Sequence, residues 1–367
     1  MEGTNNCSSS DNFSIEGFNF VVENVMIPVL GSVGIVGNVL AILVLKNPDM
    51  KSTFHQSLIA LASCDIVFLS LMLLDYTQYV NNGFYIIIFP YFLNPLKNIL
   101  LSLETFLIMS ISTERVLAVC KPVLYRTHKL RHSSAIHLLT YILPPIIFSL
   151  ILNIPKFLEA EFYIAEERIA PNVTQESLKF RFTELRLNPT YIYYYYTHWT
   201  RLLCTGIIPF FYLLIANGCI FRRMRSSNKF LISGGGLSQK SNILQKSSKS
   251  LFAIVILYLI SNTPRLLLNC VEYQYFFFIM DINYCESRSI TFWFDLLLSI
   301  NHLSLIINSS ANILIYCTIS RIFKNRLFQK LKTGFGFSVK SGNNNKQVIK
   351  RINEDIILTK NIQTFEK

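Results

Sequence analysis

The stretch that decides the fold is QSLIALASCDIVFLSLMLLDYTQY, Gln56–Tyr79. It contains only two charged side chains, Asp65 and Asp75. A bilayer core about 30 Å thick is crossed by about 20 apolar residues in a helix, because each residue rises about 1.5 Å. We therefore expect this stretch to span a membrane, with the carboxylate of Asp65 near its middle.

Six more apolar stretches of similar length predict an all-α membrane protein with a seven-transmembrane helix bundle. Hydrocarbon offers no partners to backbone polar groups, and the strands of a closed barrel would be about half as long. Charged residues make up only 15% of the chain, against about 25% in soluble domains. The other predicted spans are Val25–Leu45, Pro95–Val119, Ser134–Ile154, Tyr193–Phe221, Ser250–Tyr273 and Phe292–Cys317.

The net charge of +12 lies in short loops, so membrane topology explains it better than nucleic-acid binding does. The loops after the first, third and fifth spans hold 13 Lys and Arg residues, and the N-terminal segment and the loop after the second span hold none. Basic loops stay in the cytoplasm. We expect a multi-pass plasma-membrane protein with its N-terminus outside and its C-terminus inside. The first 24 residues lack Lys, Arg and an apolar core, so no cleaved signal peptide is expected.

The predicted domain order is an extracellular segment (1–24), the bundle (25–318), a membrane-surface helix (319–332) and a disordered cytoplasmic tail (333–367). The surface helix is expected because Arg321–Leu331 combines an apolar stripe with flanking basic residues, which suits an anionic membrane face. The alternative is a solvated run of charges.

Two ionisable residues, Glu114 and Arg115, close the third span at its cytoplasmic edge. Ionisable groups inside spans are costly and therefore point to function. A carboxylate would hold Arg115 in an inactive state and release it to a partner protein in an active one. The alternative is an arginine that reaches to the lipid headgroups.

Two carboxylates and two amides are expected to form a buried polar cluster. Asp65 and Glu104 lie at similar depth in the second and third spans, and Asn308 and Asn312 lie one turn apart in the seventh. Neighbouring carboxylates share a proton or a hard cation. The alternative is a hydrogen-bonded packing network.

Five residues on the predicted outside suggest covalent modification. Cys7 and Cys285 either form a disulfide in this oxidising compartment or remain free or differently paired thiols. Asn6, Asn12 and Asn172 begin glycosylation sequons.

The chain resembles the rhodopsin-type (class A) G-protein-coupled receptors. Six short motifs occur in the family's order, each in its own span. They are Gly37-Asn38, Leu61-Ala62-Ser63-Cys64-Asp65, Glu114-Arg115, Pro209, Pro264 and Asn312-x-x-x-Tyr316.

This resemblance implies an extracellular ligand, a heterotrimeric G protein and arrestin as partners, and a switch made of Glu114, Arg115, Asn312 and Tyr316. The chain departs from the family in lacking the cysteines of its common extracellular disulfide. It also has Val116, Asn262 and Ile313 where Tyr, Trp and Pro are usual.

Within that class the chain is similar to invertebrate FMRFamide-like peptide receptors. The stretches that carry the similarity are Glu184–Tyr191, Trp199, Asn217, Asn262–Arg265 with Asn269 and Glu272, and Asn308-Ser309-Ser310. The resemblance implies a short peptide ending in Arg-Phe-amide. The ligand's Arg needs an acid, and Arg265 or His302 would donate to its amide carbonyl. The candidate ligand-binding residues are Asp75, Lys97, Trp199, Arg265, Asn269, Glu272, Asp295 and His302.

The acids among these residues have a structural alternative, in which they pair with Arg265, Arg201 or Lys97 and only hold the helices together. Other functions are less well supported. A transporter would show inverted repeats and broken spans. A retinal photoreceptor needs a span-seven Lys, and an amine receptor an acid near Lys97. No enzyme motif, cofactor or metal site is indicated.

Overall fold

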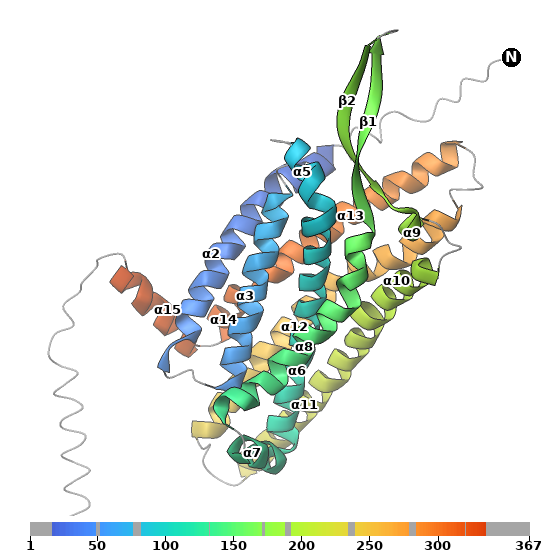
Figure 1. Cartoon of the computed structure of the whole chain (residues 1–367). Coiled ribbons are helices and arrows are strands. Elements are labelled where there is room, and N and C mark those ends of the chain that lie inside the picture. Colours follow the sequence, from blue (N-terminus) through green and yellow to red (C-terminus); the bar gives the residue numbers. More distant parts are fainter. Residues whose placement is uncertain are drawn as a thin grey trace, which may run out of the picture. The chain divides into compact units, whose positions relative to one another are not determined.

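The computed structural model describes residues 17–48, 52–75, 82–131, 133–170, 173–187, 192–233, 239–278, 284–319 and 321–334. The chain divides into two units, Met1–Lys324 and Asn325–Lys367. In the first unit long helices lie side by side as a bundle (Figure 1). The second unit holds most of α15 (Arg321–Gly334), so the predicted amphipathic segment does form a helix.

The first half of the bundle contains three spans. The π-helical turn η1 (Val22–Met26) leads into α2 (Ile27–Leu45), and α3 (Thr53–Leu74) follows. The third span is continuous through α5 (Asn82–Ile88), η3 (Phe89–Leu93) and α6 (Asn94–Cys120), and α7 (Pro122–Arg131) lies just beyond it.

The second half begins with α8 (Ser134–Asn153) and the 3-10 turn η4 (Ile154–Leu158). The hairpin β1 (Ala160–Ala170) and β2 (Val173–Phe182) and the short α9 (Glu184–Leu187) come next. The fifth span joins α10 (Ile192–Leu202), η5 (Leu203–Ile207) and α11 (Ile208–Ser233). The last spans are α12 (Gln239–Phe278), then α13 (Tyr284–Ser310) with α14 (Asn312–Ile319).

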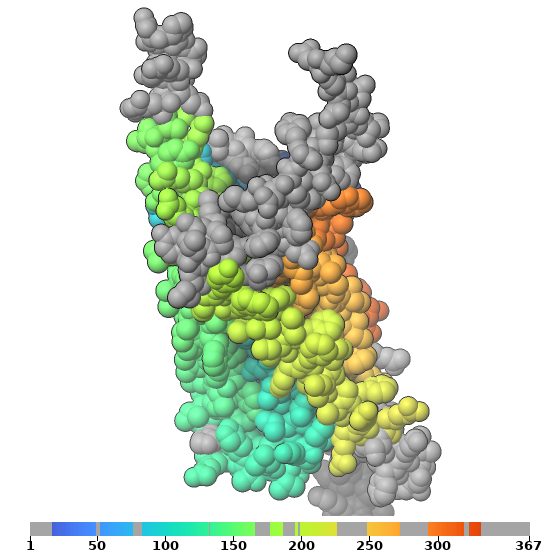
Figure 2. All heavy atoms as spheres, turned by 90° about the vertical axis from the view of Figure 1, so that its right-hand side faces the viewer, coloured from blue at the N-terminus to red at the C-terminus, as the bar shows by residue number. Residues whose placement is uncertain are grey.

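Within the described residues, six helices are long and apolar enough to cross a membrane, and a bent pair makes a seventh. The predicted seven-helix bundle is confirmed. Figure 2 shows one face of it, on which α11 (yellow-green) runs between α6 (teal) and α12 (yellow-orange). Large apolar side chains are exposed on the outside of the bundle, for example Phe211 at 58%, and such side chains suit contact with lipid.

The seventh span is bent by 44° at Ala311, although the sequence showed no broken span. The usual Pro is absent there, so the cause lies elsewhere. Asn38 of α2 donates its Nδ2 to the carbonyl of Ser309 at 2.8 Å, so a side chain from another span enters the helical ladder just before the bend. The ladder resumes with the Leu314 N–H donating to the Ala311 carbonyl at 3.0 Å.

Close approach of the helices beside this bend depends on Gly34. A Cβ there would lie 2.2 Å from the Ser310 Oγ and 2.8 Å from a methyl carbon of Leu69. Only a residue without a side chain allows α2, α3 and α13 to meet at this distance.

The antiparallel hairpin after the fourth span was not foreseen. It pairs Ala160 with Phe182, and an irregularity follows Arg168. Phe180 stacks obliquely on Phe89 with ring centroids 5.0 Å apart, and Phe162 meets Tyr91 edge-on at 5.9 Å. These contacts attach the hairpin to η3, in the part of the third span that precedes its predicted beginning at Pro95.

Candidate functional site

The four residues of the predicted polar cluster lie together in the middle of the bundle. Asn312 donates its Nδ2 to the Asp65 Oδ2 at 2.7 Å, and Asn308 donates to a carboxylate oxygen of Glu104. All four side chains are at most 5% exposed. Helices α3, α6, α13 and α14 each supply one of them, so the cluster joins three spans.

The cluster carries two carboxylates and has spare acceptors. Asp65 and Glu104 repel each other electrostatically, and the Oδ1 of Asp65 has no hydrogen-bond donor among the described residues. No three His, Cys, Asp or Glu side chains in the described ranges gather as metal ligands. The arrangement can therefore hold a proton between the carboxylates or one weakly held cation on their oxygens.

At the cytoplasmic end, Glu114 and Arg115 form a buried pair in α6. The Nε and Nη2 of Arg115 donate to the two carboxylate oxygens of Glu114 at 2.6 and 3.0 Å. The guanidinium also lies 4.2 Å from the centre of the Phe54 ring. Arg115 is 5% exposed, so its side chain lies inside the bundle and does not reach toward the headgroups.

Tyr125 in α7 completes this site, although no pattern in the sequence pointed to it. Its hydroxyl donates to the Glu114 Oε1 at 2.5 Å, and its ring meets His137 edge-on at 5.4 Å. Burial first, and then the negative charge of Glu114, raise the pKa of Tyr125, so its hydroxyl stays a donor. Tyr125, in the helix after the third span, thus binds the same Glu114 carboxylate that binds Arg115.

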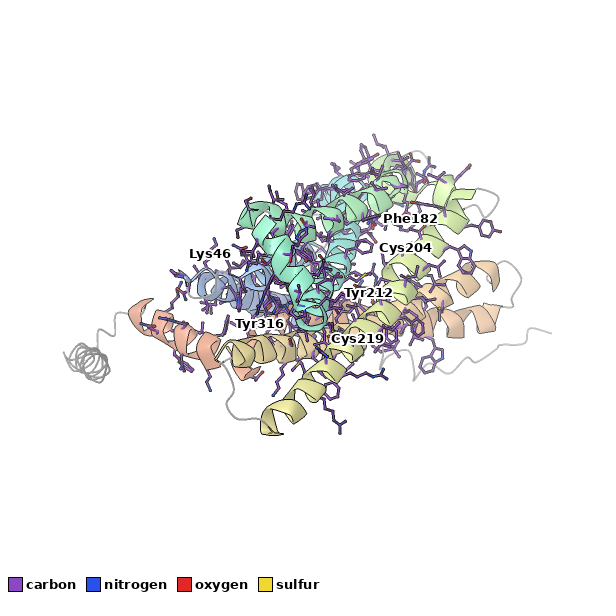
Figure 3. All side chains as sticks on the ribbon, turned by 90° about the horizontal axis from the view of Figure 1, so that it is seen from below. Lys46, Phe182, Cys204, Tyr212, Cys219 and Tyr316 are labelled. Carbon is purple, nitrogen blue, oxygen red and sulfur yellow. The ribbon has the colours of Figure 1, made fainter. Side chains whose placement is uncertain are left out.

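Tyr316, the other predicted switch residue, is 2% exposed in α14. Its ring lies 5.4 Å from Phe323, and its hydroxyl has no hydrogen-bond partner among the described residues. Figure 3, seen from below, labels Tyr316 and, on another helix, Tyr212. The Tyr212 hydroxyl is hydrogen-bonded to the Thr113 hydroxyl of α6 at 2.6 Å.

At the outer end, two predicted ligand-binding residues bind each other. The Nζ of Lys97 donates to the Asp75 Oδ2 at 2.5 Å and lies 5.6 Å from the Phe89 ring. His302 lies 2.9 Å from a carboxylate oxygen of Glu23. Asp75 and Lys97 thus form an ion pair between two helices, as the structural alternative expects, and a role of either residue in ligand binding stays a prediction.

Arg265 and Asn269 are buried on α12, at 7% and 2% exposure. The Nη1 of Arg265 has no hydrogen-bond acceptor among the described residues. The positive charge of Arg265 is repelled by Arg201 and attracted by Glu104. It lines a cavity of about 10 Å³, enough for about one water. Trp199 is exposed on α10, and Asp295 is exposed on α13.

Four other predicted residues lie outside the part of the chain that the structure describes: Cys7, Asn6, Asn12 and Asn172. Glu272 and Cys285 lie on described helices, but the positions of their side chains are not described.

A bundle of seven apolar spans with buried carboxylates in its middle and a Glu-Arg pair at one end defines a multi-pass membrane protein of the heptahelical receptor class. The sequence model of the protein family described as "7 transmembrane receptor (rhodopsin family)" matches residues 37–320. The chain belongs to that family, whose members are receptors, and the predicted family resemblance is confirmed.

Two relatives match most of the chain. The FMRFamide receptor of Drosophila melanogaster is 29% identical over 320 residues, which are 84% of this chain and 53% of that protein. The FMRFamide peptide receptor frpr-18 of Caenorhabditis elegans is 24% identical over 323 residues, 85% of this chain and 69% of that protein. The chain thus spans about half the length of its Drosophila relative.

A shorter match links the chain to the Mas-related G-protein coupled receptor member X2 of Trachypithecus francoisi, at 31% identity over 114 residues. That match covers 30% of this chain and 34% of the other protein.

Proposed function

We propose that this chain is a G-protein-coupled receptor for an extracellular neuropeptide of the RFamide type, acting through a heterotrimeric G protein. The observation that carries the proposal is the similarity to FMRFamide receptors of a fly and a nematode over more than four fifths of the chain. The test is a reporter-cell assay with a panel of amidated invertebrate peptides, in which Arg-Phe-amide peptides activate the receptor and other peptides do not.

The receptor lies in the plasma membrane with its N-terminus outside, because its basic loops follow the odd-numbered spans. Tags at the two ends, stained on intact and permeabilised cells, test this orientation. A C-terminal tag that stains on intact cells contradicts it. G protein and arrestin then meet the face that carries α7 and the ends of α6 and α11.

The signalling switch is the Glu114–Arg115 pair closed by Tyr125. In the closed state both carboxylate oxygens of Glu114 are occupied, one of them by two donors. Breaking the Tyr125 bond weakens the hold on Arg115, and the released guanidinium is then available to carbonyl or carboxylate oxygens of the G protein. Asn312 and Tyr316 belong to the same switch through the bend that precedes them.

The central cluster acts as a site for a proton or a sodium ion. Binding between Asp65 and Glu104 would relieve their repulsion and fix α3, α6 and α13 in one arrangement. Ligand affinity would then depend on sodium or on pH through this cluster.

The ligand enters between the outer ends of the spans. Arg265 donates to the amide carbonyl of the peptide, because its Nη1 is buried and lacks an acceptor in the described part of the chain. With Asp75 occupied by Lys97, the acid for the ligand's Arg is Glu272 or Asp295, and Trp199 offers an aromatic surface for its Phe. A disulfide between Cys7 and Cys285 and glycans on Asn6, Asn12 and Asn172 complete the outer face.

A further inference from the structure

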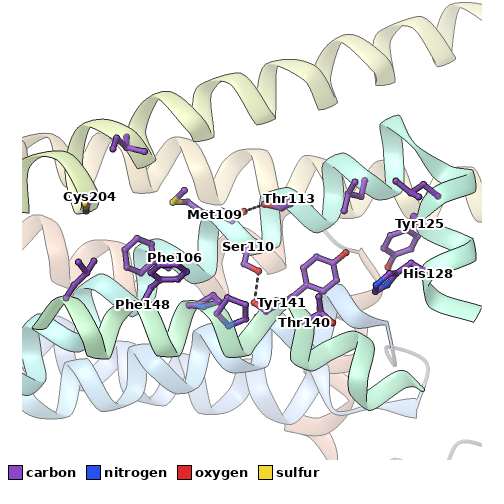
Figure 4. Close-up of a pocket in the computed structure, with 16 residues that line it drawn as sticks. Phe106, Met109, Ser110, Thr113, Tyr125, His128, Thr140, Tyr141, Phe148 and Cys204 are labelled. Atoms are coloured by element: carbon purple, nitrogen blue, oxygen red, sulfur yellow. Dashed lines mark hydrogen bonds between the residues drawn. The ribbon is translucent and has the colours of Figure 1, made fainter. Parts of the chain in front are cut away.

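A groove of about 770 Å³ is bordered by α6, α7, α8, η5 and α11, and its lining contains none of the residues of the central polar cluster. Its lining is almost wholly apolar, and several of its residues are exposed, including Phe148 at 59% and Ile208 at 55%. The groove therefore opens on the outside of the bundle. Figure 4 shows Cys204 and Phe148 near one end of it and Tyr125 and His128 near the other.

The groove lies at membrane depth, so its occupant comes from the bilayer. Its walls belong to the apolar spans Gly83–Cys120, Ser134–Leu158 and Trp199–Arg225. Along α6 it extends from Phe106 to Leu117, which is about 16 Å at 1.5 Å per residue. An elongated apolar molecule fits this shape, and the volume lies in the range of about 300–1,000 Å³ typical of small-molecule sites.

One polar feature interrupts the apolar wall. Pro144 and Pro145 lie inside α8 and have no N–H, so the carbonyls of Thr140 and Tyr141 lose their usual helical donors. Ser110 of α6 donates its hydroxyl to the Tyr141 carbonyl at 2.5 Å (Figure 4). The Thr140 carbonyl has lost its donor in the same way, and Thr140 and Pro144 both line the groove.

We propose that this groove binds a sterol-type neutral lipid whose single hydroxyl donates to the carbonyl of Thr140. A carbonyl without a donor is costly in hydrocarbon, so a hydroxyl is favoured there. A charged lipid is disfavoured, because the described lining contains no Asp, Glu, Lys or Arg. The apolar body of the lipid packs against Phe106 and Phe148, whose rings touch each other with centroids 6.4 Å apart and form one apolar surface.

Occupancy of the groove bears on the signalling switch, and this part rests on the proposed function. Tyr125 lines the groove with its ring and donates its hydroxyl to Glu114. A lipid packed against that ring limits its movement away from Glu114. The bound lipid therefore favours the closed pair and lowers basal signalling.

The test measures binding without agonist or G protein, so it does not depend on the proposed function. Purified full-length receptor in phosphatidylcholine nanodiscs is titrated with tritiated cholesterol and with its 3-O-methyl ether, which cannot donate. The parent should bind cholesterol saturably and about fivefold more tightly than the ether. Pro144→Ala restores the helical N–H to Thr140 and should remove this preference.

Phe148→Ala should weaken cholesterol binding several-fold. Phe211→Ala is the matched control, because Phe211 is equally exposed, at 58%, but does not line the groove. Equal affinity for cholesterol and its ether, or equal effects of the two Phe variants, would overturn the proposal. Binding that never saturates would also overturn it, since it shows bulk lipid only. A receptor that binds cholesterol as expected but is not activated by any amidated peptide would contradict the proposed function and would still support the sterol site.

Discussion

Replacement of Tyr125 by Phe removes one hydroxyl from the switch and leaves the ring against His137. The lost hydrogen bond is 2.5 Å long and ends on a charged, 1% exposed carboxylate. Hydrogen bonds to charged groups contribute about 1.5–3 kcal/mol, and about 1.4 kcal/mol is a tenfold change in an equilibrium constant. If the bond exists only in the closed state, Tyr125→Phe shifts the equilibrium toward the open state by roughly tenfold or more.

Basal G-protein activation in cells, normalised to surface receptor, is the assay for this shift. We expect Tyr125→Phe to raise basal signalling several-fold and to increase the potency of the peptide. Tyr141→Phe is the control, because Tyr141 also packs on His137, at 5.4 Å, without a hydroxyl bond to Glu114. Unchanged basal signalling and potency at equal expression would refute the view that Tyr125 holds Glu114 in the inactive state.

Four further changes test other parts of the molecule. Arg115→Ala should abolish signalling while surface expression and peptide binding persist; normal signalling would exclude Arg115 from G-protein coupling. Glu104→Gln should flatten the dependence of peptide affinity on sodium or pH, and an unchanged dependence would leave only a packing role for the cluster. Glu272→Arg should abolish the response to the peptide, and a peptide with its Arg changed to Glu should partly restore it; Glu272→Ala with parental affinity moves the search to Asp295. Gly34→Ala should lower the free energy of unfolding of the purified receptor by about 1–3 kcal/mol, because the added Cβ meets Ser310. Gly218→Ala should not, because nothing lies within 4 Å of a Cβ at that position.

The sequence by itself determined the spans and their number. Hydrophobicity is a local property, and about 20 apolar residues in a row have no stable place other than a membrane-crossing helix. The same kind of reasoning identified Asp65, Glu104 and Arg115 as residues of interest, because a charge inside such a helix is costly wherever it points.

Tertiary structure alone decided which of these groups meet. Asn308 and Glu104 are separated by 204 residues, and Asn312 and Asp65 by 247, so their pairing depends on how whole helices rotate and pack. The same holds for Tyr125, which reaches Glu114 only because α7 turns back beside α6. The pairing of Asp75 with Lys97 was one of the alternatives that the sequence allowed, and it depends on the spatial approach of α3 and α6. The bend at Ala311 lies beside a hydrogen bond from Asn38 of α2 to the Ser309 carbonyl, a contact that no local pattern in the seventh span contains.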